Sequence, residues 1–190
     1  MFGQRGQEAA PFELLVAVVI MGFVLLAGVN VMDVLRKEEC KGQLDNQLEK
    51  IKVAIESVVS GEGQKDFSFT LPTCFQRNQS RNDVQPSLLK IIDKQSRQIC
   101  SAYCTGGKVE CMLLWFSSQE HHNVKCLNIS TVTNFPAVPG QEPCNDNFEG
   151  LTVKARDLKE PIEDGQYLLV RKFYLGSTSA DICAYKKEVR

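Results

Sequence analysis

The sequence predicts an α+β protein, in which a long N-terminal α-helix packs on a disulfide-rich antiparallel β-sheet head. Three observations predict this fold. Residues 14–32 form an apolar run with no charge and a single amide, Asn30. A helical stripe of apolar residues follows, and the remaining chain alternates short strand-like segments with turn residues and contains most of the eight cysteines.

The apolar run has the length of a membrane-spanning helix. At about 1.5 Å per residue, its 19 residues extend roughly 28 Å, close to the ~30 Å of a bilayer core. Gly22 and Gly28 let neighbouring helices approach closely. Two alternatives stay open. The first is a buried helix of a soluble protein, although such helices are rarely apolar on all sides for so long. A secretory signal peptide has a basic start, a shorter apolar stretch and a small-residue cleavage site, and these features are absent here.

Helical periodicity continues beyond the run. Apolar residues at 4-3-4-3 spacing form one stripe, which indicates packing against a core rather than a coiled-coil seam: Leu44, Leu48, Ile51, Ile55 and Val58. Glycines at 61 and 63 indicate the helix end, and Gly42 is a weak point where a bend could form. We therefore expect one helix over residues 7–60, with a membrane half at about 14–32 and an amphipathic half at about 33–59.

Residues 64–190 are expected to form one extracellular, β-rich head. Strands are expected at residues 67–71, 109–117, 124–129, 151–155, 167–175 and 182–187. Residues 88–101 are interpreted as a short second helix. Gly106 and Gly107 suggest a hairpin turn before the strand at 109–117.

The cysteines and two sequons indicate an oxidising, extracellular compartment. An even number of cysteines suggests disulfides, although eight allow 105 pairings that the sequence cannot distinguish. Cys40 lies on the helix, so one bridge could join the helix to the head. Asn78 and Asn128 each begin an Asn-x-Ser pattern and are candidate glycosylation sites. The disulfide candidates are Cys40, Cys74, Cys100, Cys104, Cys111, Cys126, Cys144 and Cys183.

No catalytic motif is recognisable, so we expect no enzyme and no cofactor. The sequence lacks a phosphate loop, a nucleophile elbow and a metalloprotease motif. A zinc site using His121 and His122 is disfavoured because adjacent residues on a strand point to opposite faces. An acidic group at Asp157, Glu160, Glu163 and Asp164 is expected to be a solvated loop, with a calcium site as the sharper alternative. A net charge of −1 gives no basic excess for nucleic acid.

The segment before the apolar run resembles the class III signal peptide of type IV pilin-like proteins, in their archaeal form. The resemblance rests on Arg5-Gly6-Gln7 and on Phe12, the sixth residue after the proposed cut. It implies that a prepilin peptidase cleaves between Gly6 and Gln7, removing residues 1–6. The family usually has Glu at the position of Pro11, so Glu8 or Glu13 is the candidate partner for a neighbouring subunit's amino terminus.

The resemblance implies a structural subunit of an extracellular type IV pilus-like filament, polymerised through the apolar helix. Its partners would be copies of itself in a helical homopolymer, the prepilin peptidase and pilus assembly machinery, and the membrane before assembly. The precursor would be membrane-inserted and the product a cell-surface filament, with cell adhesion as a role. The alternatives are a minor pilin or pseudopilin of a secretion or adhesion machine, and an uncleaved single-pass anchored extracellular binding domain.

Overall fold

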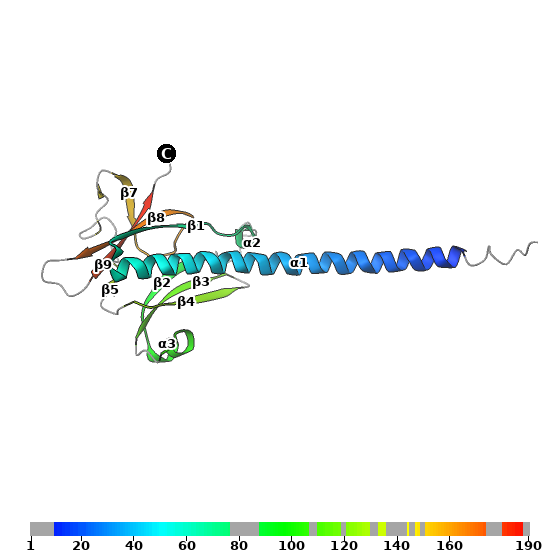
Figure 1. The fold of residues 1–190 in the computed structure, drawn as a ribbon, viewed down its shortest axis with the longest axis horizontal. Coiled ribbons are helices and arrows are strands. Elements are labelled where there is room, and N and C mark those ends of the chain that lie inside the picture. Colours follow the sequence, from blue (N-terminus) through cyan, green and yellow to red (C-terminus); the bar gives the residue numbers. More distant parts are fainter. Residues whose placement is uncertain are drawn as a thin grey trace, which may run out of the picture. The chain divides into compact units, whose positions relative to one another are not determined.

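The computed structural model describes residues 10–76, 88–106, 110–118, 121–129, 133–135, 144, 147–148, 151–173 and 180–187. The chain divides into two compact units, Met1–Gly42 and Gln43–Arg190. The first unit contains the apolar helical segment. The second contains the rest of the helix and all the strands, and is called the head below (Figure 1).

One helix dominates the N-terminal part of the chain. Helix α1 runs without interruption over Ala10–Ser57. Its first turn accommodates Pro11, since the backbone N–H groups of a first turn have no intrahelical acceptor. A π-helical turn, Val58–Glu62, follows and ends the helix. Gly61 and Gly63 have φ angles of 132° and 76°, which glycine adopts without a steric penalty, so the predicted helix end is confirmed.

The larger sheet of the head has six strands. Its main order is β1-β8-β9-β7-β6, with antiparallel pairs throughout, and β5 joins β9 as a parallel neighbour. The strands are β1 (Gln64–Phe69), β5 (Thr133–Asn134), β6 (Asn147–Phe148), β7 (Leu151–Arg156), β8 (Gly165–Phe173) and β9 (Ala180–Lys187).

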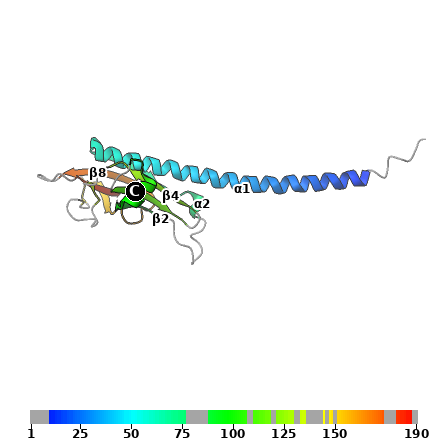
Figure 2. The ribbon, with the colours of Figure 1, turned by 90° about the horizontal axis from the view of Figure 1, so that it is seen from below.

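The smaller sheet has three antiparallel strands in the order β2-β3-β4. These are β2 (Leu88–Gln95), β3 (Cys111–Ser117) and β4 (His122–Leu127). Helix α3 (Arg97–Tyr103) joins β2 to β3, and a single helical turn, α2 (Thr73–Gln76), follows β1. In Figure 1 the two sheets lie on either side of the part of α1 that belongs to the head, and Figure 2 shows that this part of the helix runs along one face of the strands.

The predicted apolar stripe of α1 is confirmed as the centre of the head. Leu44, Leu48, Ile51, Ile55 and Val58 each have 0% of their surface exposed. They belong to one hydrophobic cluster with inward-facing residues of both sheets, which are Phe67, Phe69, Leu89, Ile91, Met112, Leu114, Phe116, Leu127, Tyr167, Leu169, Ile182 and Ala184. The head therefore requires the helix for its core.

Polar contacts join the helix and a loop to the ends and edges of the sheets. The side-chain oxygen of Gln47 accepts a hydrogen bond from the Thr70 amide after β1, at 3.1 Å. On the other side, the loop between β7 and β8 contacts β2. The Ile91 amide donates to the Leu158 carbonyl at 2.7 Å, and the Ile162 amide donates to the Leu89 carbonyl at 2.6 Å. These bonds satisfy backbone groups that an open sheet edge would expose.

Three expectations for the head were wrong. The strands form two sheets, with one parallel pair, rather than one antiparallel sheet. Residues 88–101 are not one helix, because they contain strand β2 and the start of α3. The segment before Gly106 is consequently helical, so no hairpin forms there. The six expected strands are all present, with bounds shifted by at most three residues.

Candidate functional site

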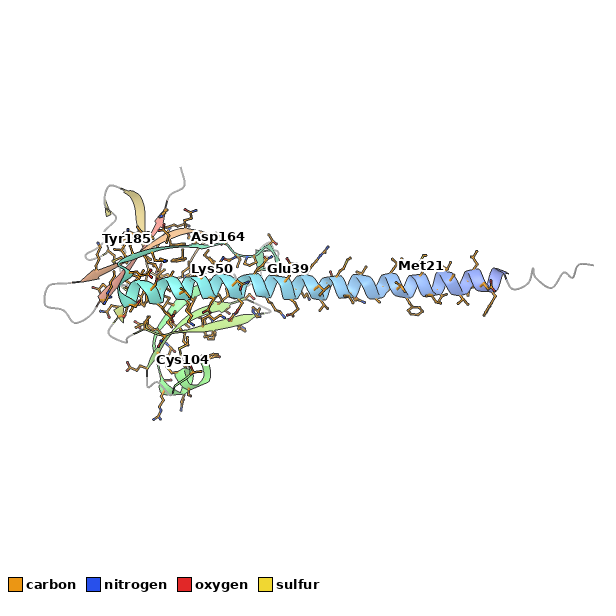
Figure 3. All side chains as sticks on the ribbon, in the orientation of Figure 1. Met21, Glu39, Lys50, Cys104, Asp164 and Tyr185 are labelled. Atoms are coloured by element: carbon orange, nitrogen blue, oxygen red, sulfur yellow. A yellow bond between two sulfur atoms is a disulfide. The ribbon has the colours of Figure 1, made fainter. Side chains whose placement is uncertain are left out.

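The first half of α1 is an exposed apolar surface. Every residue from 12 to 39 is exposed, and the large apolar side chains range from 38% exposed at Val16 to 69% at Phe12 and Phe23. Figure 3 shows side chains standing out from the helix on several sides around Met21. In the described part of the chain, this helix alone is long and apolar enough to cross a membrane.

Charge is confined to the two ends of this surface. Glu13 is exposed in the first turn of α1, where a carboxylate is favoured by the helix dipole. The next charged residue is Asp33, and mixed charges follow it, including a Glu38–Lys41 ion pair of 2.7 Å. Residues 14–32 of α1 are thus an uncharged helical segment, with charged residues before and after it. Arg5, Gly6, Gln7 and Glu8, which carry the predicted cleavage site, lie outside the described residues.

All eight cysteines are in disulfides, as the sequence predicted. The pairs Cys100–Cys111 and Cys104–Cys126 attach α3 to the outer face of the smaller sheet. The pair Cys144–Cys183 lies beside the outer face of the larger sheet, in a cluster with Tyr185. Cys40 and Cys74 are also disulfide-bonded. Disulfides of this number are typical of proteins that fold in an oxidising compartment.

One of the two sequons can be placed. Asn128 follows β4 and is exposed, and its backbone amide donates to a Glu56 carboxylate oxygen at 2.6 Å. Its side chain is therefore on the surface of the head, where a glycan could be attached. Asn78 lies outside the described residues.

The two histidines contact different partners. The His121 ring stacks against Phe75 with centroids 6.0 Å apart, whereas His122 Nδ1 lies 3.0 Å from the Ser117 hydroxyl. Among the residues that the structure describes, no group of three His, Cys, Asp or Glu side chains could hold a metal ion.

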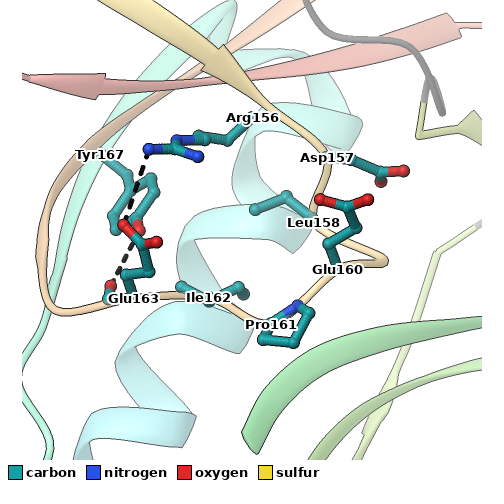
Figure 4. Close-up of a pocket in the computed structure, with 8 residues that line it drawn as sticks. All are labelled: Arg156, Asp157, Leu158, Glu160, Pro161, Ile162, Glu163 and Tyr167. Carbon is teal, nitrogen blue, oxygen red and sulfur yellow. Dashed lines mark hydrogen bonds and ion pairs between the residues drawn. The ribbon is translucent and has the colours of Figure 1, made fainter.

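The acidic loop between β7 and β8 lines a small open hollow (Figure 4). Its lining residues are Arg156, Asp157, Leu158, Glu160, Pro161, Ile162, Glu163 and Tyr167. The carboxylates do not converge. Glu163 approaches Lys186 at 2.7 Å and Arg156 at 3.6 Å, whereas Asp157 and Glu160 lie at the opposite side of the hollow. Asp164 points elsewhere and accepts the Leu71 amide at 2.8 Å.

These partners explain the protonation behaviour of the loop. The Lys186 ammonium, with a smaller contribution from Arg156, lowers the pKa of the Glu163 carboxyl. Burial, together with the nearby Glu163 charge, raises the pKa of Tyr167 to about 12, and its hydroxyl donates to the Glu163 carbonyl at 2.8 Å. The loop is therefore built as a set of internal ion pairs and hydrogen bonds around Tyr167, rather than as a calcium cage.

Sequence reasoning missed an aromatic group on the outer face of the smaller sheet. The Trp115 ring lies 6.3 Å from Tyr103 and 6.3 Å from His122, measured between ring centroids. No signal in the sequence distinguished Trp115, because β3 is apolar throughout and the usual alternation between faces is lost.

No protein-family model, curated protein or solved structure matches this chain.

Proposed function

We propose that this protein is a structural subunit of an extracellular filament, polymerised through the first half of α1 after cleavage between Gly6 and Gln7. One observation carries the proposal. A single continuous helix is apolar and exposed in its first half and forms the core of a disulfide-bonded head in its second half. The helix thus combines an element for burial in lipid or among copies of itself with an element that the head needs to fold.

The energetics favour burial of this surface. About 25 cal/mol is gained for each Å² of apolar surface removed from water, and the exposed large side chains extend from Phe12 to Leu35. A bilayer buries them in the precursor. In the assembled filament, the same side chains would be buried against neighbouring copies of the helix, with the heads outside. A heterologous contact that does not close into a ring produces a helical polymer.

The charged groups at the start of the helix would set the register between subunits. Cleavage leaves a positively charged α-amino group at Gln7. A carboxylate in an apolar environment is costly unless it is paired. Glu8 or Glu13 of a neighbouring copy would supply the partner. The prepilin peptidase and the pilus assembly machinery would be the other partners.

The chain supplies a matched control for the cleavage step. Gly3 and Gly6 are both followed by Gln, but only Gly6 is preceded by Arg. Both variants are expressed in cells that contain a class III peptidase, and the intact mass of the purified protein is measured. We expect Gly6→Leu to remain unprocessed and Gly3→Leu to be processed normally. Normal processing of Gly6→Leu would refute the proposal. A wild-type chain that is never cleaved would identify a membrane-anchored binding domain instead.

A further inference from the structure

We propose that the aromatic face around Trp115 is a binding site for an acidic saccharide. The proposal is independent of filament assembly, because every residue that carries it lies on the head. The site comprises Trp115 on β3, Tyr103 on α3, and Lys90 and His122 on the two flanking strands.

Strand register places these side chains on one surface. Lys90 is directly opposite Trp115, and Leu89 and Ile91 on either side of it belong to the core, so Lys90 faces outward with Trp115. His122 is opposite Ser117, two positions along β3 from Trp115, and the planes of the His122 and Trp115 rings meet at 47°. The ring of Tyr103 meets Trp115 edge-on.

The surface is partly exposed and pre-organised. Tyr103 and His122 are exposed, whereas Trp115 and Lys90 are half-buried. Among the described residues of the head, only three large apolar side chains are strongly exposed, and two of them, Ile99 (38%) and Tyr103 (47%), lie four residues apart on α3. Two disulfides fix that short helix to β3 and β4. A rigid aromatic surface loses little conformational entropy when a ligand binds, which is why Tyr and Trp predominate at binding sites.

The chemistry selects the ligand class. The indole N–H of Trp115 and the ammonium of Lys90 are donors only, and the Tyr103 hydroxyl can also donate. The described outward positions of β2, β3 and β4, and the whole of α3, carry no carboxylate. Flat rings with donor groups around them fit a ligand that has an apolar ring face and an excess of acceptors. A sugar ring that carries a carboxylate has these properties.

A nucleic acid fits less well. Single-stranded binding requires a groove of cations that follows the backbone. On α3 and at the described outward positions of the smaller sheet, Lys90 and Arg97 are the only permanent cations, and the chain has a net charge of −1. A stable protein partner would require a larger surface, because a standard interface takes about 20–30 residues from each partner.

The test uses the fluorescence of Trp115, the only tryptophan in the chain. The full-length protein, in a polyoxyethylene detergent that contains no sugar, is titrated with oligogalacturonate and with a neutral malto-oligosaccharide of the same length. We expect a saturable change in emission with the acidic ligand and binding at least about fivefold weaker with the neutral one. Calorimetry of the same samples gives a second, independent affinity.

One pair of variants tests the site, and a matched pair serves as the control. Tyr103→Ala should weaken binding about tenfold, the scale of one aromatic contact, and Lys90→Gln should remove the preference for the acidic ligand. Val53→Ala and Lys50→Gln, both at exposed positions on α1, should change neither. Unaltered far-ultraviolet circular dichroism and an unchanged melting temperature show that each variant is folded. The proposal would be overturned by no saturable binding, by equal binding of both sugars or by unchanged binding in Tyr103→Ala. Oligothymidylate is titrated in parallel, and a saturable emission change with it but not with oligogalacturonate would also overturn the proposal.

Discussion

Replacement of Leu48 by Ala tests whether the second half of α1 is the core of the head. Leu48 is fully buried and lies in a cluster to which both sheets contribute, so the surrounding backbone is fixed on several sides. Leu→Ala changes at such positions remove transfer free energy and leave a cavity, and together these cost about 2.7–5.0 kcal/mol. Because the surrounding backbone can move little to fill the cavity, we expect the cost of Leu48→Ala to lie in the upper half of that range.

The expected loss is measurable as a shift in melting temperature. For a chain of this size, 1 kcal/mol corresponds to about 2–4 °C, so a cost in the upper half of the range should lower the Tm of Leu48→Ala by roughly 8–20 °C. The assay is thermal unfolding of the full-length, oxidised protein in detergent, followed by near-ultraviolet circular dichroism. This signal reports the aromatic residues, most of which lie in the head.

Val53→Ala provides the control on the same helix. Val53 is 52% exposed and lies five residues from Leu48, so its truncation should change stability by no more than about 0.5 kcal/mol. Equal Tm values for the two variants would refute the reasoning, because the helix would then contribute no more to the head through its buried stripe than through its exposed face.

Three further predictions concern the head. Lys186 lowers the Glu163 pKa more than Arg156 does, so the Glu163–Lys186 pair stabilises the fold above about pH 4.5, and its contribution is lost as pH falls through the lowered pKa. Lys186→Met should remove the larger part of this pH dependence, at a cost below about 1 kcal/mol because Glu163 is 59% exposed, as measured by urea unfolding across acidic pH. The pKa of Tyr167 is raised to about 12, so the stability that the protonated hydroxyl provides is complete below pH 10 and declines as pH rises through 12. The tyrosinate absorbance titration should lose a late component in Tyr167→Phe. Replacing both Cys144 and Cys183 by Ala opens a loop of 39 residues and should cost about 4 kcal/mol, against about 3 kcal/mol for the pair that closes 11 residues, as measured by guanidinium unfolding.

The sequence was sufficient to predict the elements whose apolar residues follow a clear period. The stripe from Leu44 to Val58 has the spacing of one helical face, and that face is buried. Glycine at 61 and 63 allowed the helix end to be located, since both adopt positive φ angles. The six expected strands were found for the same reason, because each is a short apolar or alternating run between turn residues.

Residues 88–101 were misassigned because their apolar residues serve two surfaces. Leu89 and Ile91 face the common core, whereas Ile92 packs beneath α3 on the opposite face of the same sheet. A strand that is buried on both faces loses its alternation and looks like a buried helix. The partition into two sheets and the pairing of the cysteines depend on contacts between distant segments, which no local pattern encodes.

The candidate sites were predictable to different degrees. The exposed apolar half of α1 was evident from its uninterrupted composition. The acidic loop was noticed, but its role depends on Arg156 and Lys186, which come from neighbouring strands and could not be paired with Glu163 from sequence. The aromatic face could not be predicted for the same reason. Tyr103 contacts Trp115 because two disulfides hold α3 against β3 and β4, and those pairings were not known from the sequence.

The N-terminus of the assembled chain tests the central proposal most directly. Filaments sheared from cells and analysed by intact and N-terminal peptide mass spectrometry should contain a chain that begins at Gln7, with all eight cysteines oxidised. A filament-associated chain that retains Met1, or recovery of the chain only as a membrane-anchored monomer, would contradict assembly through a processed α1.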